Sequence, residues 1–266
     1  MHDVGVILRY ARLPRHCVKQ KSVPMTEVPC GDEHFSDSSD YQARFRGVKI
    51  NLLFTRQGQF KARFSWIELP HLLLVRAKES QSRLAHMSLA SDQAAIAFPT
   101  RSRPFQMFDG PVLESGNFAF YGPGGHLYQR TLGACNLGLI LLPTEYLAVQ
   151  LKALAGPKVM LPLAGSVLRP SRSATARLRQ LHWKACQFAI RKSEAVVAQK
   201  VIDALENDIL RALVACLTSN SLTVLQRTRR RHKEIIDQFQ DILAAHPDRS
   251  GARPRHPRRP CPRLRF

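Results

Sequence analysis

The sequence lacks any apolar run long enough to cross a membrane. Its longest strongly apolar stretch, Leu137 to Pro143, falls far short of the roughly 20 residues that a bilayer-spanning helix needs. The apolar stretch from Val4 to Leu8 is too short for a secretory signal and is followed by three arginines. We therefore expect no membrane partner and a cytoplasmic location.

Closely spaced cysteines and histidines are also missing. The six cysteines form no CxxC pair, and the ten histidines show no HxH or HExxH spacing. This argues against a zinc ribbon and a disulfide framework, so we interpret most cysteines as small core residues. We expect no metal and no cofactor. The cysteines are Cys17, Cys30, Cys135, Cys186, Cys216 and Cys261.

Acidic residues are scarce beside basic ones. Twenty Asp and Glu oppose forty Lys and Arg, which gives a net charge of +20 in 266 residues, of which 44% are hydrophobic. The chain can therefore build a core and attract an anionic partner. The cations form three clusters: residues 146–193, which contain no acidic residue, the segment from Arg227 to Lys233, and the tail 250–266. The second cluster comprises Arg227, Arg229, Arg230, Arg231 and Lys233.

The N-terminal residues 1–46 are irregular in pattern. Pro14, Pro24 and Pro29 interrupt them, and a polar tract runs from Asp32 to Asp40. This composition predicts a mobile arm. Met25 opens a stretch that resembles a natural start, so residues 1–24 could be an upstream extension of the reading frame.

Residues 47–143 contain short apolar runs separated by turn residues, a pattern typical of a small antiparallel β-barrel. The segment from Gly116 to His126 predicts a strand and a tight Gly-Pro-Gly-Gly turn at residues 122–125, and the next apolar strand follows at a distance and ends at Pro143. The expected strands are Lys49–Thr55, Gln59–Leu69, Leu72–Lys78, Ser82–Ser88, Ala94–Pro99, Phe105–Phe108, Asn117–Tyr121 and Cys135–Leu142.

After Pro143 the hydrophobic period changes from 2 to 3.6, so residues 144–226 predict a helical region and the fold class is α+β. A short helix begins at Thr144 and ends before Gly156, a second begins near Ser171 or Ser173, and a third begins near Ser193. The third carries a long apolar stripe, which exceeds what one small barrel covers and indicates self-association. The stripe, our candidate dimerisation surface, is Val197, Val201, Leu205, Ile209 and Leu213.

Two C-terminal segments follow. Residues 227–249 predict one more amphipathic helix, with Ile235, Phe239 and Ile242 on one face. Residues 250–266 are rich in Arg and Pro and predict a disordered tail, because they cannot bury enough apolar area to fold.

Three parts of the chain together resemble the N-terminal half of a bacterial AraC-type transcriptional regulator. They are the segment from Gly116 to His126 with the strand that ends at Leu142-Pro143, the helices from Ser171 to Thr218, and the segment from Arg229 to Asp248. The resemblance implies a cupin-like barrel with a pocket for a small-molecule effector, followed by a dimerisation hairpin. It also implies a homodimer, or a heterodimer with an intact relative, and weak DNA contact.

The chain departs from that family after Asp248. The family continues with two helix-turn-helix units that enter successive major grooves, whereas here Arg/Pro-rich sequence follows. We therefore expect a truncated regulator that keeps its sensing and dimerisation parts, and no enzyme activity.

Two other functions stay open at this stage. The basic clusters would give a protein that binds nucleic acid without reading its sequence, although a solvated helix face with an accidental tail explains them as well. A cupin-type enzyme would need a metal, and only His126 matches a ligand position. We interpret His71 and His86 as strand-end or core histidines. The spacing of Trp183 and Phe188 favours core packing over base stacking.

Overall fold

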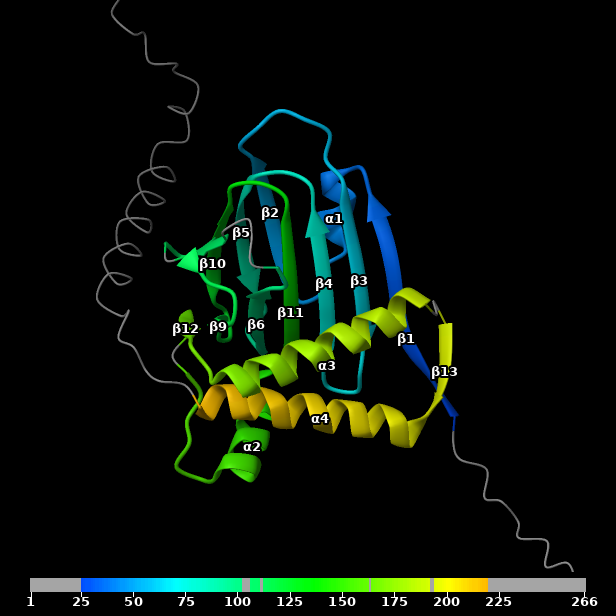
Figure 1. Cartoon of the computed structure of the whole chain (residues 1–266), viewed down its shortest axis with the longest axis vertical. Coiled ribbons are helices and arrows are strands. Elements are labelled where there is room, and N and C mark those ends of the chain that lie inside the picture. Colours follow the sequence, from blue (N-terminus) through cyan, green and yellow to red (C-terminus); the bar gives the residue numbers. More distant parts are fainter. Residues whose placement is uncertain (1–24, 102–105, 111, 163, 192–193, 220–266) are drawn as a thin grey trace, which may run out of the picture.

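The computed structural model describes residues 25–101, 106–110, 112–162, 164–191 and 194–219. Within them, two antiparallel sheets face each other (Figure 1). The larger sheet has the strand order β12-β9-β6-β11-β4-β3-β1-β13, and the smaller has the order β2-β5-β10-β7-β8. The strands are β1 (Met25–Phe35), β2 (Val48–Phe54), β3 (Ala62–Glu68), β4 (Leu73–Glu79), β5 (Arg83–Leu89), β6 (Gln93–Pro99), β7 (Gln106–Phe108), β8 (Val112–Leu113), β9 (Phe118–Tyr121), β10 (His126–Thr131), β11 (Cys135–Pro143), β12 (Ser166–Leu168) and β13 (Glu194–Ala198).

The strands divide their side chains between two cores. On β4, Val75 points into the space between the sheets, while Leu74 points to the outer face of the larger sheet. The inner core also holds the rings of Tyr41, Phe45 and Phe64, which meet edge to face. This alternation follows from the two-residue period of a strand.

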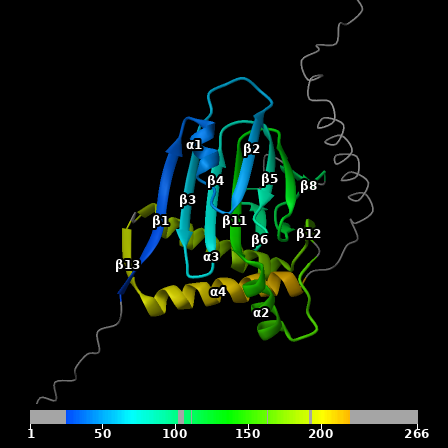
Figure 2. The same cartoon turned by 180° about the vertical axis from the view of Figure 1, so that it is seen from behind.

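Helices cover the outer face of the larger sheet (Figure 1). They are α2 (Thr144–Ala155), α3 (Arg172–Arg191) and α4 (Gln199–Thr218), whereas the short α1 (Ser38–Ala43) packs beside β2. Seen from behind, β2 and β5 lie on the side away from α3 (Figure 2). Helix α3 packs on the larger sheet at Gly138, which has no side chain and so leaves room for the ring of Phe98. That ring contacts the ring of His182 on α3 at a centroid distance of 5.0 Å.

The structure confirms the predicted fold class, an α+β protein with a cupin-like antiparallel barrel. All eight expected strands are present. The predicted turn joins β9 of the larger sheet to β10 of the smaller one, with Gly124 at a φ of +64°. There the Gly125 N–H donates to the Gly122 carbonyl at 3.1 Å. Glycine is needed at position 124 because other residues adopt this backbone region only with strain.

Two boundaries need correction. The predicted arm, residues 1–46, is folded from Met25 onward: β1 pairs with β3 and β13, and α1 follows. Pro29 hid this strand from the sequence pattern, and it lies where β1 pairs with the short edge strand β13. The third helix begins at Gln199 instead of Ser193, because residues 194–198 extend along β1. Within the predicted helical region 144–226, strands β12 and β13 therefore accompany the three helices.

The remaining predicted boundaries lie outside the described residues. These are the arm residues 1–24, the helix 227–249 and the tail 250–266. Among the residues that are described, no helix is long and apolar enough to pass through a membrane.

Candidate functional site

The resemblance to AraC-type regulators predicts an effector pocket inside the barrel, in the space between the two sheets. Side chains fill it: aromatic and aliphatic residues from both sheets and from α1 make one continuous core. One end of this core is polar, although its members are buried. Buried polar groups inside an apolar barrel are either structural or the fixed points of a ligand site.

An ion pair forms the centre of this polar end. The Nε of Arg83 on β5 donates to Oε2 of Glu79 on β4, and its Nη2 donates to Oε1 at 3.0 Å. Both side chains are 2% exposed. Burial acts to raise the pKa of Glu79, but the charge of Arg83 and several hydrogen bonds hold that pKa below its ordinary value. Glu79 is therefore a buried carboxylate anion.

Neutral polar groups complete the network. The hydroxyl of Tyr41 donates to Glu79 at 2.6 Å, and the thiol of Cys135 donates to it at 3.2 Å. Burial, reinforced by the Glu79 charge, raises the pKa values of both donors. On the other side, Arg83 Nη2 donates to the side-chain Oε1 of Gln129 at 2.9 Å, and Gln129 Nε2 donates to Oε1 of Gln106 at 2.9 Å. Arg83 Nη1 is buried without a hydrogen-bond partner.

His126, the one histidine that matches a ligand position, lies elsewhere. Its ring stacks on that of His86 on the smaller sheet with centroids 5.4 Å apart, and the ring of Tyr128 lies 4.8 Å from that of His86. Burial, together with the charges of His126 and Lys49, lowers the pKa of His86. Among the described residues, no group of three or more His, Cys, Asp or Glu side chains is placed to hold a metal ion.

His71 belongs to a clamp that sequence reasoning missed. It lies in the turn between β3 and β4, where its backbone N–H and its Nδ1 bond the carboxylate of Glu206 on α4 at 3.0 and 2.8 Å. The Tyr146 hydroxyl of α2 donates to the same carboxylate at 3.1 Å. One buried carboxylate thus fixes α4 to the barrel and to α2. No local sequence pattern predicts this clamp, because the residues that form it are up to 135 positions apart.

The predicted dimerisation residues divide between surface and core. Val201 is 56% exposed on α4, and Leu205 is partly buried. Ile209 and Leu213 are buried against the barrel within the same chain. Val197 lies in β13, where its backbone pairs with Thr26, so it is not part of the helical stripe. Part of the apolar stripe therefore packs α4 on the barrel of the same chain, because the larger sheet and α3 cover more of the stripe than we expected.

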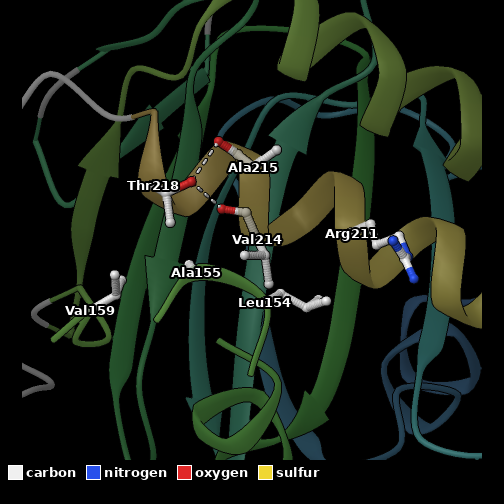
Figure 3. A pocket seen from close by; sticks show the side chains of 7 residues that line it. All are labelled: Leu154, Ala155, Val159, Arg211, Val214, Ala215 and Thr218. Atoms are coloured by element: carbon white, nitrogen blue, oxygen red, sulfur yellow. Dashed lines mark hydrogen bonds between the residues drawn. The ribbon is translucent and has the colours of Figure 1, made fainter. Parts of the chain in front are cut away.

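A groove of about 490 Å³ separates α4 from the end of α2 (Figure 3). Val214 points from α4 toward Leu154, and Arg211 stands at one side. Leu154 is 42% exposed, and Val149, earlier on α2, and Met160, after α2, are also exposed. This side of the molecule therefore carries apolar side chains in contact with water.

The predicted nucleic-acid contacts, Arg227, Arg229, Arg230, Arg231 and Lys233, lie outside the described residues. Within the described part, the interpretation of Trp183 as a core residue was wrong: its side chain is 49% exposed, whereas Phe188 packs against the core. The helix turns Trp183 outward because its neighbour His182 takes the buried position, with Nε2 bonded to the Val75 carbonyl at 3.0 Å.

Comparisons with known proteins give only distant likenesses, all of them to solved structures. No protein-family model and no curated protein matches the chain. Among solved structures, the AraC-like transcriptional activator CuxR is similar with 16% identity over 80% of this chain and 79% of that chain, at a TM-score of 0.49. An RmlC-like cupin from Shewanella frigidimarina has 14% identity over 44% and 95% of the two chains, at 0.27. A cupin 2 barrel protein from Rhodopseudomonas palustris has 11% identity over 52% and 88%, at 0.25. Likenesses at this level do not extend to activity.

Proposed function

We propose that this chain is an AraC-like regulator that senses an effector and dimerises in the cytoplasm, and that it binds rather than catalyses. The observation that carries the proposal is the exposure of apolar side chains on the helical layer: Val201 on α4, and Val149, Leu154 and Met160 on and after α2. Apolar side chains left in contact with water on one layer favour association with another protein when they form a patch.

The sensing part of the proposal rests on the polar end of the barrel. Side chains fill this interior, so an effector would have to open the core; it would then find hydrogen-bonding partners in Arg83, Glu79 and Gln129. Glu206 gives the barrel a direct link to α4 and α2, because it bonds the turn between β3 and β4. A change in barrel shape would therefore reach the surface proposed for association.

The partner is a second copy of this chain or an intact relative. In a heterodimer, the relative would supply the groove-reading helices and would be drawn away from its operator. The alternative proposal is binding of nucleic acid without sequence preference through Arg227 to Lys233. It predicts affinity that falls steeply with salt and that is largely lost when residues 227–266 are removed.

The test of association is sedimentation velocity on three variants. Val201→Asp and Leu154→Asp each place a charge on the helical side, whereas Leu53→Asp places one on β2, where Leu53 is 65% exposed. We expect the wild-type chain to form dimers and at least one helical variant to weaken them about 30-fold, a loss of about 2 kcal/mol that is typical of a central contact residue. Leu53→Asp should leave the dimer unchanged.

Two results would contradict the proposal. One is a wild-type chain that stays monomeric at every concentration. The other is a dimer that only Leu53→Asp disrupts, because association would then use the smaller sheet. Each variant is first checked for an unchanged melting temperature, so that loss of the dimer is not confused with loss of the fold.

A further inference from the structure

Helix α3 differs from the rest of the surface in its charge. It carries five basic residues and no acidic one between Arg172 and Arg191. Its buried side packs on the larger sheet and on α4 through residues such as Leu178 and Ala185. Trp183 and four of the basic residues are exposed on the other side, whereas Arg179 is half-buried at the edge. This outward side of α3 is a cationic helix face with one large exposed aromatic ring.

Two sets of basic side chains flank Trp183 on the helix. Arg179 precedes Trp183 by one turn and lies on the same side of the helix. Lys184 lies about 100° further round, in a stripe with Arg177 and Arg191 at seven-residue spacing. Beneath this edge of α3 lies Arg76 of β4. Burial first, and the charge of Arg76 to a smaller extent, lower the pKa of His182, the neighbour of Trp183, to about 4. Arg76 therefore lies near the buried side of α3, where His182 points.

Most of these charges are not neutralised by the protein. Arg177 pairs with Asp208 of α4 at 3.5 Å. Arg179 donates to the Thr100 carbonyl at 3.1 Å and to the Ser115 hydroxyl at 3.2 Å, which fixes its position and leaves its charge. Within the described part of the chain, Arg76, Lys184 and Arg191 form no ion pair. The outward side of α3 is therefore positively charged, and hydrogen bonds fix the position of Arg179 at its edge.

We propose that this outward side of α3 binds single-stranded nucleic acid, with Trp183 stacked on a base and Lys184 and Arg191 placed against phosphates. Proteins that bind single strands without reading sequence combine these two elements, an aromatic ring and a positively charged track. The proposal is independent of dimerisation. It also uses none of the residues from Arg227 onward.

Charge argues against the other occupants of this surface. A second copy related by a twofold axis would place Lys184 and Arg191 near the same residues of its partner, and such like charges repel. A membrane surface would need a broad apolar face, whereas Trp183 is the one large apolar side chain exposed on α3 among the described residues. Duplex DNA offers phosphates but keeps its bases stacked inside, so the ring would gain nothing.

The experiment is fluorescence anisotropy on the full chain with a labelled oligothymidine and with a blunt duplex of the same length, over a series of salt concentrations. Trp183→Ala should weaken single-strand binding about tenfold and duplex binding little, because base stacking is lost. Trp183→Phe keeps a stacking ring and should restore most of the affinity. Met160→Ala, which shortens another exposed apolar side chain, is the control.

A matched pair of double variants tests the charges. Lys184→Ala with Arg191→Ala removes two cations from α3, and Lys152→Ala with Lys158→Ala removes two exposed cations on and after α2. Each phosphate contact contributes about 0.7 to the salt dependence for single strands, so the α3 pair should lower the slope of log affinity against log salt by about 1.4. The α2 pair should leave it unchanged.

Four results would overturn the proposal. The first is single-strand affinity that is unchanged in Trp183→Ala, and the second is equal loss for single strand and duplex. The third is an equal change of slope in the two double variants, which would mean general attraction to a basic protein. The fourth is conversion of a dimer to a monomer by Trp183→Ala, which would assign the surface to a second copy. Melting curves confirm that each variant is folded.

Discussion

The outer faces of the two sheets obey the same alternation of side chains but have different neighbours. Eight of the nine residues of β11 are buried, because the smaller sheet lies on one side of it and the helices lie on the other. On β2, buried and exposed residues alternate at first, and Leu53 is 65% exposed. A strand buried on both faces thus identifies the sheet that carries the helical layer. That layer then presents its own surface, with Val201, Leu154 and Trp183 in water.

The largest loss of stability should come from a charge placed beneath the helical layer, and a charge on the outer face of the smaller sheet should cost little. Ile209→Asp puts a carboxylate into the core between α4 and the barrel, where the side chain is fully buried, and should lower the free energy of unfolding by about 5 kcal/mol. Leu53→Asp should change it by no more than about 0.5 kcal/mol. Urea unfolding measures both. Similar losses for the two variants would mean that the outer face of the smaller sheet is also covered.

The next effect concerns the ion pair inside the barrel. Arg83→Met leaves Glu79 buried and unpaired, and should cost about 3 to 5 kcal/mol of stability. The control is Arg46→Met, which breaks an exposed pair with Glu68 and should cost less than about 1 kcal/mol. The double variant Glu79→Leu with Arg83→Met should regain much of the loss, because no charge is then buried alone. A harmless Arg83→Met would refute the buried pair.

A smaller effect follows from the histidine beneath α3. Burial lowers the pKa of His182 from 6.5 to about 4, so the folded protein favours the neutral ring. Its contribution is complete above pH 6.5 and is lost as the pH falls toward 4, by about 3 kcal/mol in all. His182→Gln, which keeps a donor toward the Val75 carbonyl, should remove this part of the pH dependence. His86→Gln, on the open sheet, should leave most of it, and equal effects would contradict this account.

Much of the fold was predictable from the sequence because period and turn residues act locally. The eight apolar runs and the glycine turn at residues 122–125 marked strands and a corner without any tertiary information. Strands β1 and β13 escaped prediction because each lies at or near a sheet edge, where Pro29 is tolerated. The short β10 escaped because only every second residue, such as Leu127, is buried.

The candidate site was harder to predict because it depends on contacts between distant residues. The Glu206 clamp joins residues more than 130 positions apart, and the Arg83 network joins β4, β5, β7, β10 and α1. Helical periodicity assigned Ile209 to one side of α4 and Trp183 to one side of α3, but it did not show which side of each helix packs on the barrel. The stripe chosen for dimerisation was thus partly the inward side of α4, and the ring chosen for the core was outside.

Hydrogen–deuterium exchange on the full chain over a range of protein concentrations tests whether the protein associates through the helical layer, as we propose, or through the smaller sheet. We expect peptides from α2 and α4 to gain protection as the concentration rises, while peptides from β2 and β5 keep constant exchange. Concentration-dependent protection in β2 and β5 alone, or constant exchange everywhere, would contradict this proposal.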